Sequence, residues 1–452
     1  MRRASRSFTH FLKSIPVFFV LQTFGCYESI LSIPKGAGNA QGDCDTCFDT
    51  DDTEAYPTVS RNYTGVDLLI AVDTSSSMTM TLEVLPTHIY SLIARLTAPI
   101  VDENEDSVPA VENLKVALVT ADMGLQTGET GDTSLSPSNT AGCEALLGDN
   151  GAFQPADSAT SAVPIFGEFL ECDPKDRECP EGFYCTDDGT CAVSPGADSM
   201  LECTDHSTAV PSTSETFFNE DIAHQTACLS YRSTAACGYE QTLEAMLRGL
   251  EAHPSFVEED HVLAVVIISD EDDCSIETPD LFSTPEWSDS NLANIACNAN
   301  ETDESCLFDP LRYPERLKAL KGGREDAVVF AAFAGVPILP DKGNPCEGSG
   351  THLTAAGCLD RSEMEPVPVE NMYTDGNVFV TFRAVCTRYS EDVYESVFQD
   401  ARPGRRFVRA AQAFGNAGMV FSICREDWSD GLDRITDAVS ARIVLPNNET
   451  AR

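Results

Sequence analysis

Short, nearly continuous apolar runs alternate in this sequence with stretches in which apolar residues recur every three or four positions. Continuous runs of this length are typical of parallel strands buried on both faces, and steps of three and four are typical of a helix with one buried face. A strand, a helix and a second strand in succession form a βαβ unit. The pattern therefore predicts an α/β fold with one doubly wound, mostly parallel sheet flanked by helices.

The expected strands share the continuous apolar character and lie at 66–73, 114–120, 261–270, 326–335, 377–385 and 418–424. The expected helices share the three-and-four spacing and cover 85–96, 243–250 and 432–443. Together these elements predict one domain over 61–447.

Three stretches of this domain are rich in Cys, Pro, Gly, Ser and acidic residues and are predicted as loop insertions, at 125–235, 276–315 and 340–375. The densest run of cysteines reads CDPKDRECPEGFYCTDDGTC at 172–191. Its spacings are typical of a small disulfide-stapled knot and not of a zinc site.

The 18 cysteines of the chain indicate an oxidising, extracytoplasmic location. A basic start and an apolar run at 15–21 predict an export signal over 1–25, and this run is too short to span a bilayer. The sequence TFGC at 23–26 resembles the end of a bacterial lipoprotein signal, although Thr23 stands where Leu is usual. Cys26 is therefore the lipidation candidate, which would anchor the protein to a membrane of the bacterial cell envelope. Secretion after ordinary cleavage and a retained anchor are the alternatives.

Residues 26–60 are rich in Gly, Asp and Thr, carry no apolar period and are predicted as a flexible acidic tether. Cys44 and Cys47 within it have C-x-x-C spacing. Without a second cysteine pair or a βαβ context, this spacing favours a small disulfide loop over metal or redox chemistry.

The charge of the chain argues against a nucleic-acid partner. Lys and Arg number 29 and Asp and Glu number 73, which gives a formal net charge of −44. Binding to a phosphate backbone needs clustered cations, and a net charge of this sign and size would repel the backbone.

The motif LLIAVDTSSSM places Asp73, Ser75 and Ser77 directly after a buried strand and before a helix. In an open α/β sheet, ligands collect at the carboxyl ends of the strands. One carboxylate and two hydroxyls suit Mg²⁺, which keeps water molecules where the protein supplies few charges, and a carboxylate of another molecule can replace such a water. The motif thus predicts metal-bridged adhesion; a polar loop with a helix cap is the alternative, because Ser and Asp are favoured at helix N-termini.

Over about 65–445 the chain resembles the von Willebrand factor type A domain, with its metal-ion-dependent adhesion site. The family's pattern continues with a Thr before a helix and an Asp at the end of the next strand. The resemblance implies that Asp270, which ends VVIISD, and Thr242, in CGYEQTLEAML, complete the site. Glu271 stands where the family usually has Gly.

Thr242 follows Gly238 by four residues and is expected near or inside the helix. Glu240, Gln241 or Thr234 could therefore provide the metal-ligating oxygen in place of Thr242. The carboxylates at 271–273 would make the site more acidic and more suited to Ca²⁺. Mg²⁺ or Ca²⁺ is therefore the expected ion, with Mn²⁺ as a third candidate. Disulfides of Cys237 and Cys274 are expected to brace the two loops that contain Thr242 and Asp270.

No motif of an enzyme is found in the sequence: it has no G-x-S-x-G elbow, no H-E-x-x-H and no Gly-rich phosphate loop. We therefore expect an extracytoplasmic binding module, not an enzyme, that coordinates a carboxylate of a protein partner through its metal. The alternatives are a disulfide-stabilised structural envelope protein with a degenerate metal site, and a hydrolase.

Overall fold

The computed structural model describes these residues: 63–97, 100–101, 107–108, 110–124, 148–155, 162–164, 168–171, 183–185, 190–193, 200–202, 209–211, 220–232, 234, 238–277, 296–297, 300, 306–339, 344–349, 353, 357–372, 378–390 and 397–443. The expected export signal, the lipidation candidate Cys26, the tether with Cys44 and Cys47, and Cys237 lie outside them. Within the described part, no helix has the length and apolar character needed to cross a membrane.

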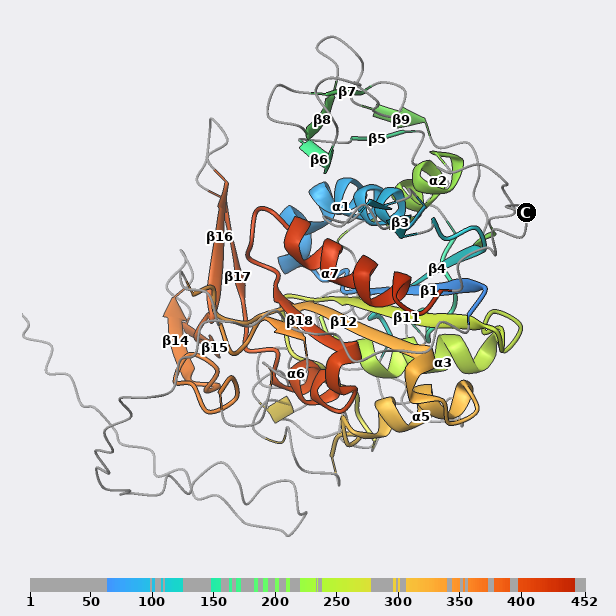
Figure 1. Cartoon of the computed structure of the whole chain (residues 1–452). Helices are drawn as coiled ribbons and strands as arrows, with labels where there is room; N and C mark the ends of the chain where they lie inside the picture. The colour runs from blue at the N-terminus through green and yellow to red at the C-terminus, as the bar shows by residue number, and fades with distance from the viewer. Residues whose placement is uncertain are drawn as a thin grey trace, which may run out of the picture.

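The core of the protein is a seven-stranded sheet (Figure 1). Its five inner strands are parallel and its two edge strands are antiparallel. In spatial order the strands are β10 (Ala209–Pro211), β4 (Leu114–Thr120), β1 (Gly65–Val72), β11 (His261–Ile268), β12 (Val328–Ala334), β18 (Gly418–Ser422) and β13 (Gly348–Ser349). Every residue of β1, β11 and β12 is buried, as the continuous apolar runs predict. The α/β class and the mostly parallel sheet are therefore confirmed.

Helices cover both faces of this sheet (Figure 1). On one face lie α1 (Thr79–Thr97), α2 (Glu220–Ser230) and α7 (Ser429–Ser440), and on the other lie α3 (Thr242–Ala252), α5 (Arg312–Leu320) and α6 (Arg405–Gln412). Two hydrophobic cores result: the first lies between the sheet and α1, α2 and α7, and the second between the sheet and α3, α5 and α6. Successive residues of β1 alternate between them, so that Leu68 and Ile70 pack in the first core and Leu69 and Ala71 in the second.

The strand order reverses direction at β1. From β1 the chain passes through α1 to β4 on one side, and later returns to β11 on the other side of β1. The register pairs Val72 with Ile268, so the two strands end side by side. At such a reversal the loops leave in opposite directions and open a crevice in which ligands of α/β proteins bind. Asp73 and Asp270 follow these two strand ends.

The stretch 125–235, expected as an insertion, also contributes to the main domain. It supplies the edge strand β10 and the helix α2, which packs against α1. Ile222, Ala227 and Leu229 of α2 are buried in the first core. The remaining strands of this stretch form two small antiparallel sheets, from β5 (Ala162–Pro164) with β9 (Met200–Glu202), and from β6 (Glu168–Glu171), β8 (Thr190–Val193) and β7 (Phe183–Cys185).

The run at 377–385 forms a strand, but outside the main sheet. This strand, β15 (Val378–Phe382), pairs antiparallel with β14 (Pro368–Met372). A parallel neighbour in the main sheet needs a long crossover connection, whereas β14 precedes β15 closely enough for a hairpin. A second hairpin follows from β16 (Cys386–Ser390) and β17 (Val397–Ala401). The short remaining elements are β2 (Ile100–Val101), β3 (Ser107–Val108), η2 (Ser76–Met78), η4 (Glu325–Ala327) and η5 (Gly415–Ala417).

Three disulfides are formed between described cysteines: Cys274–Cys297, Cys346–Cys358 and Cys386–Cys424. The first confirms that a bridge of Cys274 braces the loop after β11. Disulfides of this kind indicate an oxidising, extracytoplasmic setting.

Candidate metal centre

Asp73 is fixed at the end of β1 by its own loop and by the neighbouring strand. Its side chain is fully buried. Its backbone N–H donates to the carbonyl oxygen of Ile268 at 2.9 Å, and its Oδ1 accepts the backbone N–H of Ser75 at 2.7 Å. The hydroxyl of Ser269 donates to Oδ2 at 3.0 Å. The carboxylate is therefore held in one orientation by donors from two strand ends.

Asp270 reaches the same point from β11. The hydroxyl of Ser77 donates to Asp270 Oδ1 at 3.0 Å, although the two residues are 193 positions apart in the sequence. The hydroxyls of Ser75 and Ser77 lie 2.9 Å apart, and the charge of Asp73 raises the pKa of Asp270. The structure thus brings together Asp73, Ser75, Ser77 and Asp270, four residues that the sequence assigns to one site.

Two glutamates add to this pair of aspartates. Glu240 lies two residues before the first residue of α3 and is 1% exposed, and the charge of Glu271 raises its pKa. Its Oε2 has no hydrogen-bond partner among the described residues. Glu271, which follows Asp270 directly, therefore brings a further carboxylate into the group.

The pKa shifts show how costly this concentration of negative charge is. Burial, followed by the charges of Asp73 and Glu271, raises the pKa of Asp270 well above its usual value. Burial and the charge of Glu271 do the same for Glu240, and burial also raises the pKa of Asp73. Burial and Asp73 raise the pKa of Glu271 to about 7, against the opposing effect of the Arg402 guanidinium. A cation at this point would relieve the repulsion.

Thr242 is the first residue of α3 and is fully buried. Its hydroxyl has no hydrogen-bond partner within the described part of the chain. A buried hydroxyl without a partner costs about 1–3 kcal/mol, which a ligand would recover. Of the alternatives for its role, Gln241 is already engaged: its amide donates to the Gly124 carbonyl oxygen at 3.3 Å and accepts the N–H of Ile276 at 3.2 Å.

The group fits a hard divalent cation. Its donors are carboxylate and hydroxyl oxygens, which Mg²⁺ and Ca²⁺ prefer. Two of its buried oxygens, Glu240 Oε2 and the Thr242 hydroxyl, have no hydrogen-bond partner among the residues that the structure describes. The residues that would hold the ion are Asp73, Ser75, Ser77, Asp270 and Thr242, with Glu240 and Glu271 beside them.

Asp273 serves the structure of the neighbouring loop, which corrects the expectation that it adds acidity to the site. Its Oδ1 accepts the backbone N–H of Leu243 at 2.9 Å and so caps α3. Its Oδ2 forms a buried ion pair with Arg406 Nε at 3.1 Å. Asp272 Oδ1 accepts the backbone N–H of Arg406 at 2.9 Å. Of the three carboxylates at 271–273, that of Glu271 raises the pKa of Asp270 through its charge.

Gln399 and Thr81 are the residues that the sequence did not indicate. Gln399 Nε2 donates to Asp270 Oδ2 at 2.9 Å, and the Thr81 hydroxyl donates to Gln399 Oε1 at 2.8 Å. Gln399 lies on β17, far from the motif in sequence, and a single glutamine in a strand carries no recognisable signal.

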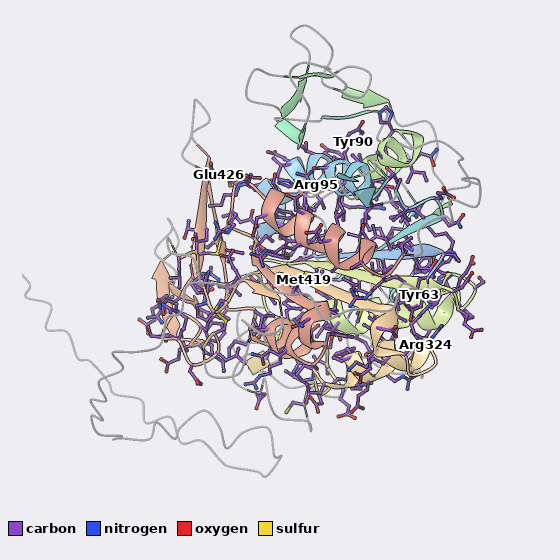
Figure 2. The ribbon with its side chains drawn as sticks, in the orientation of Figure 1. Tyr63, Tyr90, Arg95, Arg324, Met419 and Glu426 are labelled. Carbon is purple, nitrogen blue, oxygen red and sulfur yellow. A yellow bond between two sulfur atoms is a disulfide. The ribbon has the colours of Figure 1, made fainter. Side chains whose placement is uncertain are left out.

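A second acidic group lies at the other end of the sheet, where Figure 2 labels Tyr63 and Arg324. Glu258, Asp260 and His261 are close enough together there to hold a metal ion. However, Lys115 Nζ lies 2.9 Å from Glu258 Oε1 and lowers the pKa of that carboxylate. Lys115 already supplies a positive charge to this second group, so the group around Asp73 is the stronger candidate for a metal site.

No protein-family model matches the chain, and no curated protein matches it.

Proposed function

We propose that the chain is an extracytoplasmic binding module with a doubly wound domain of the von Willebrand factor type A kind. In this proposal Asp73, Ser75, Ser77 and Asp270 hold Mg²⁺ or Ca²⁺, with Thr242 completing the set. The observation that carries the proposal is the convergence of two buried aspartates, from adjacent strands, at the point where the strand order reverses. A cation bound there would supply positive charge and a coordination position open to a carboxylate of a partner protein.

The residues around the site support a preformed centre. Ser75 and Ser269 hold the Asp73 carboxylate, while Ser77 and Gln399 hold that of Asp270. These donors fix the carboxylates without a bound ion, so little reorganisation would accompany binding.

The extra glutamates bear on the choice of metal. Glu240 and Glu271 add carboxylates to a site that in the family has fewer, and Ca²⁺ accepts more carboxylate ligands than Mg²⁺ does. We therefore expect Ca²⁺ to bind at least as tightly as Mg²⁺, with Mn²⁺ as a useful substitute in experiments. A lipid anchor at Cys26 would hold this module at a membrane, and secretion is the alternative.

Titration calorimetry with Mg²⁺, Ca²⁺ and Mn²⁺ tests the site. The wild type should release or absorb heat on binding, and Asp73→Asn, which keeps the shape and removes the charge, should weaken binding by at least about 100-fold. Glu258→Gln is the matched control, because it removes a carboxylate from the second acidic group. Binding lost in Glu258→Gln and retained in Asp73→Asn would place the ion elsewhere and reject the proposal.

Capture of envelope proteins on the immobilised wild type in Ca²⁺ then tests the partner. Elution by a chelator, and competition by an acidic peptide but not by its amidated counterpart, are the expected results. A partner that stays bound in chelator, or that is captured equally by Asp73→Asn, would contradict metal-bridged binding.

A further inference from the structure

The β16–β17 hairpin reaches the candidate metal centre with one side chain. Gln399 of β17 is 4% exposed and donates through Nε2 to Asp270 Oδ2. The residue after β17, Arg402, donates its backbone N–H to the Asp270 carbonyl oxygen at 2.7 Å. Asp270 is therefore held by this segment through both its backbone and its carboxylate.

The orientation of the Gln399 amide is set from α1. The Thr81 hydroxyl donates to Gln399 Oε1, which leaves Nε2 facing Asp270. The reversed amide would place Oε1 against a carboxylate oxygen, which is repulsive. Thr81 itself is fully buried at the start of α1. A relay thus runs from Thr81 through Gln399 to Asp270.

The hairpin is fixed to the sheet at its base. Cys386, at the start of β16, is bonded to Cys424, which follows β18. Beyond β17, Gly404 donates its N–H to the Gly335 carbonyl oxygen at 2.9 Å, and a side chain on Gly335 would collide with the Arg402 carbonyl oxygen. Figure 1 shows β16 and β17 as an upright pair of strands beside the end of the sheet. The position of Gln399 is therefore set by the sheet itself.

We propose that Gln399 is a positioning residue of the metal centre: by binding Asp270 Oδ2 it leaves Oδ1 directed to Ser77 and so sets the affinity of the site for divalent cations. Each oxygen of Asp270 then has one donor, one from the D-x-S-x-S loop and one from the hairpin. This inference rests on the proposed function, and it assigns part of the metal site to a segment outside the family motif.

Calorimetry with Ca²⁺ and Mn²⁺ on Gln399→Met tests the proposal. Methionine keeps the length of the side chain and removes the hydrogen bonds of the amide to Thr81, to Asp270 and to the Met78 sulfur. Partners that hold a metal ligand in place typically contribute 10–100-fold in affinity, so we expect Ca²⁺ binding to weaken by about 10-fold or more. Gln412→Met is the matched control, since the Gln412 amide donates to the Leu353 carbonyl oxygen and not to the site.

Thr81→Val gives a second test that leaves Gln399 and the hairpin intact. It should weaken Ca²⁺ binding in the same direction but less, and the double variant should bind no more weakly than Gln399→Met alone, because both changes act through one relay. In chelator, Thr81→Val should melt below the wild type because Gln399 Oε1 loses its donor. The rise in melting temperature on adding Ca²⁺ should also be smaller than in the wild type.

The outcomes separate this inference from the proposed function. Wild-type affinity in both Gln399→Met and Thr81→Val would overturn the positioning role and leave the metal site standing. A wild type that binds none of the three ions would overturn both. If Gln399→Met does not fold, Thr81→Val alone decides, and unchanged affinity in it rejects the relay.

Discussion

Asp67 and Asp73 lie near the two ends of β1 and are both fully buried, yet they are stabilised in different ways. Asp67 has basic partners: Lys115 Nζ lies 3.2 Å from its Oδ1, and His261 Nδ1 lies 2.8 Å from the same atom. Asp73 has hydroxyl and amide donors and faces further carboxylates. A buried charge is costly unless it is paired. The basic partners of Asp67 stabilise its negative charge, whereas a cation bound from solution would stabilise that of Asp73.

The pH dependence of stability has one identifiable contributor in His88. Its ring stacks on Trp428 at 4.3 Å between centroids, and burial together with Arg388 lowers its pKa from 6.5 to about 3; Arg95 acts in the same direction and Asp427 against it. Because the unfolded chain binds the proton first, stability should fall as pH decreases from 6.5 towards 3. The loss should be about 3 kcal/mol by pH 4.5, since each of the two pH units below 6.5 contributes about 1.4 kcal/mol.

Urea unfolding in chelator between pH 7.5 and 4.5 measures this loss. His88→Phe keeps an aromatic ring on Trp428 and has no proton to bind, so its stability should decline less over the same range. An identical decline in both proteins would show that other groups are responsible.

The sequence indicated the residues that follow strands and missed those that depend on packing. Asp73, Ser75, Ser77 and Asp270 stand directly after apolar runs, which is why their convergence could be predicted. Gln399 meets Asp270 only because a disulfide and a glycine contact hold its hairpin at the end of the sheet. No local pattern encodes that arrangement.

At the scale of elements, α3 depends on a loop far from it in sequence. Asp273 caps the Leu243 N–H, and the Ser275 hydroxyl accepts the Glu244 N–H at 3.0 Å. The helix that begins at Thr242 is thus positioned by the segment that follows Asp270. The two sides of the candidate metal centre are held together by this cap.

Removal of this cap should destabilise the whole domain. Asp273→Ala also removes the carboxylate that pairs with Arg406 Nε, and Arg406 is 1% exposed. Breaking a buried ion pair costs about 3–5 kcal/mol. The control, Asp430→Ala, removes an exposed partner of Arg434 and should change stability by less than about 1 kcal/mol. Urea unfolding in chelator measures both, and equal small effects would refute the role of the cap.

Elements with a continuous or periodic apolar pattern were predicted well, and those fixed by long-range pairing were not. The strand at 114–120 is observed with the same bounds as β4. The run at 377–385 has the same apolar character, but its partner is the adjacent β14 and not the main sheet. Helix α2 is hidden in a Cys-rich stretch, and its burial depends on the face that α1 presents to it.

For the whole molecule, two of the disulfides provide a comparison. Cys386–Cys424 closes a separation of 38 residues and Cys346–Cys358 one of 12. The chain-entropy relation gives about 4 and 3 kcal/mol of stabilisation respectively. The first bridge fixes the hairpin that carries Gln399, and the second joins the two sides of the segment that contains the edge strand β13.

Replacement of each pair by serine should therefore lower stability by similar amounts and have different effects on Ca²⁺ binding. Cys386→Ser with Cys424→Ser should weaken binding several-fold, whereas Cys346→Ser with Cys358→Ser should leave it unchanged. Denaturant unfolding and calorimetry on the same samples give both quantities. Equal Ca²⁺ affinities in the two double variants would show that the Cys386–Cys424 bridge does not affect the site.

The strand order has a consequence for how the protein matures. The oxygens of the candidate centre come from the loops after β1 and β11, and Gln399 comes from β17, so the full length from Asp73 to Gln399 separates the first contributor from the last. A chain that is synthesised amino end first presents Asp73 and Asp270 before Gln399. The complete set of side-chain contacts to Asp270 can therefore form only after the hairpin of β16 and β17 has been made.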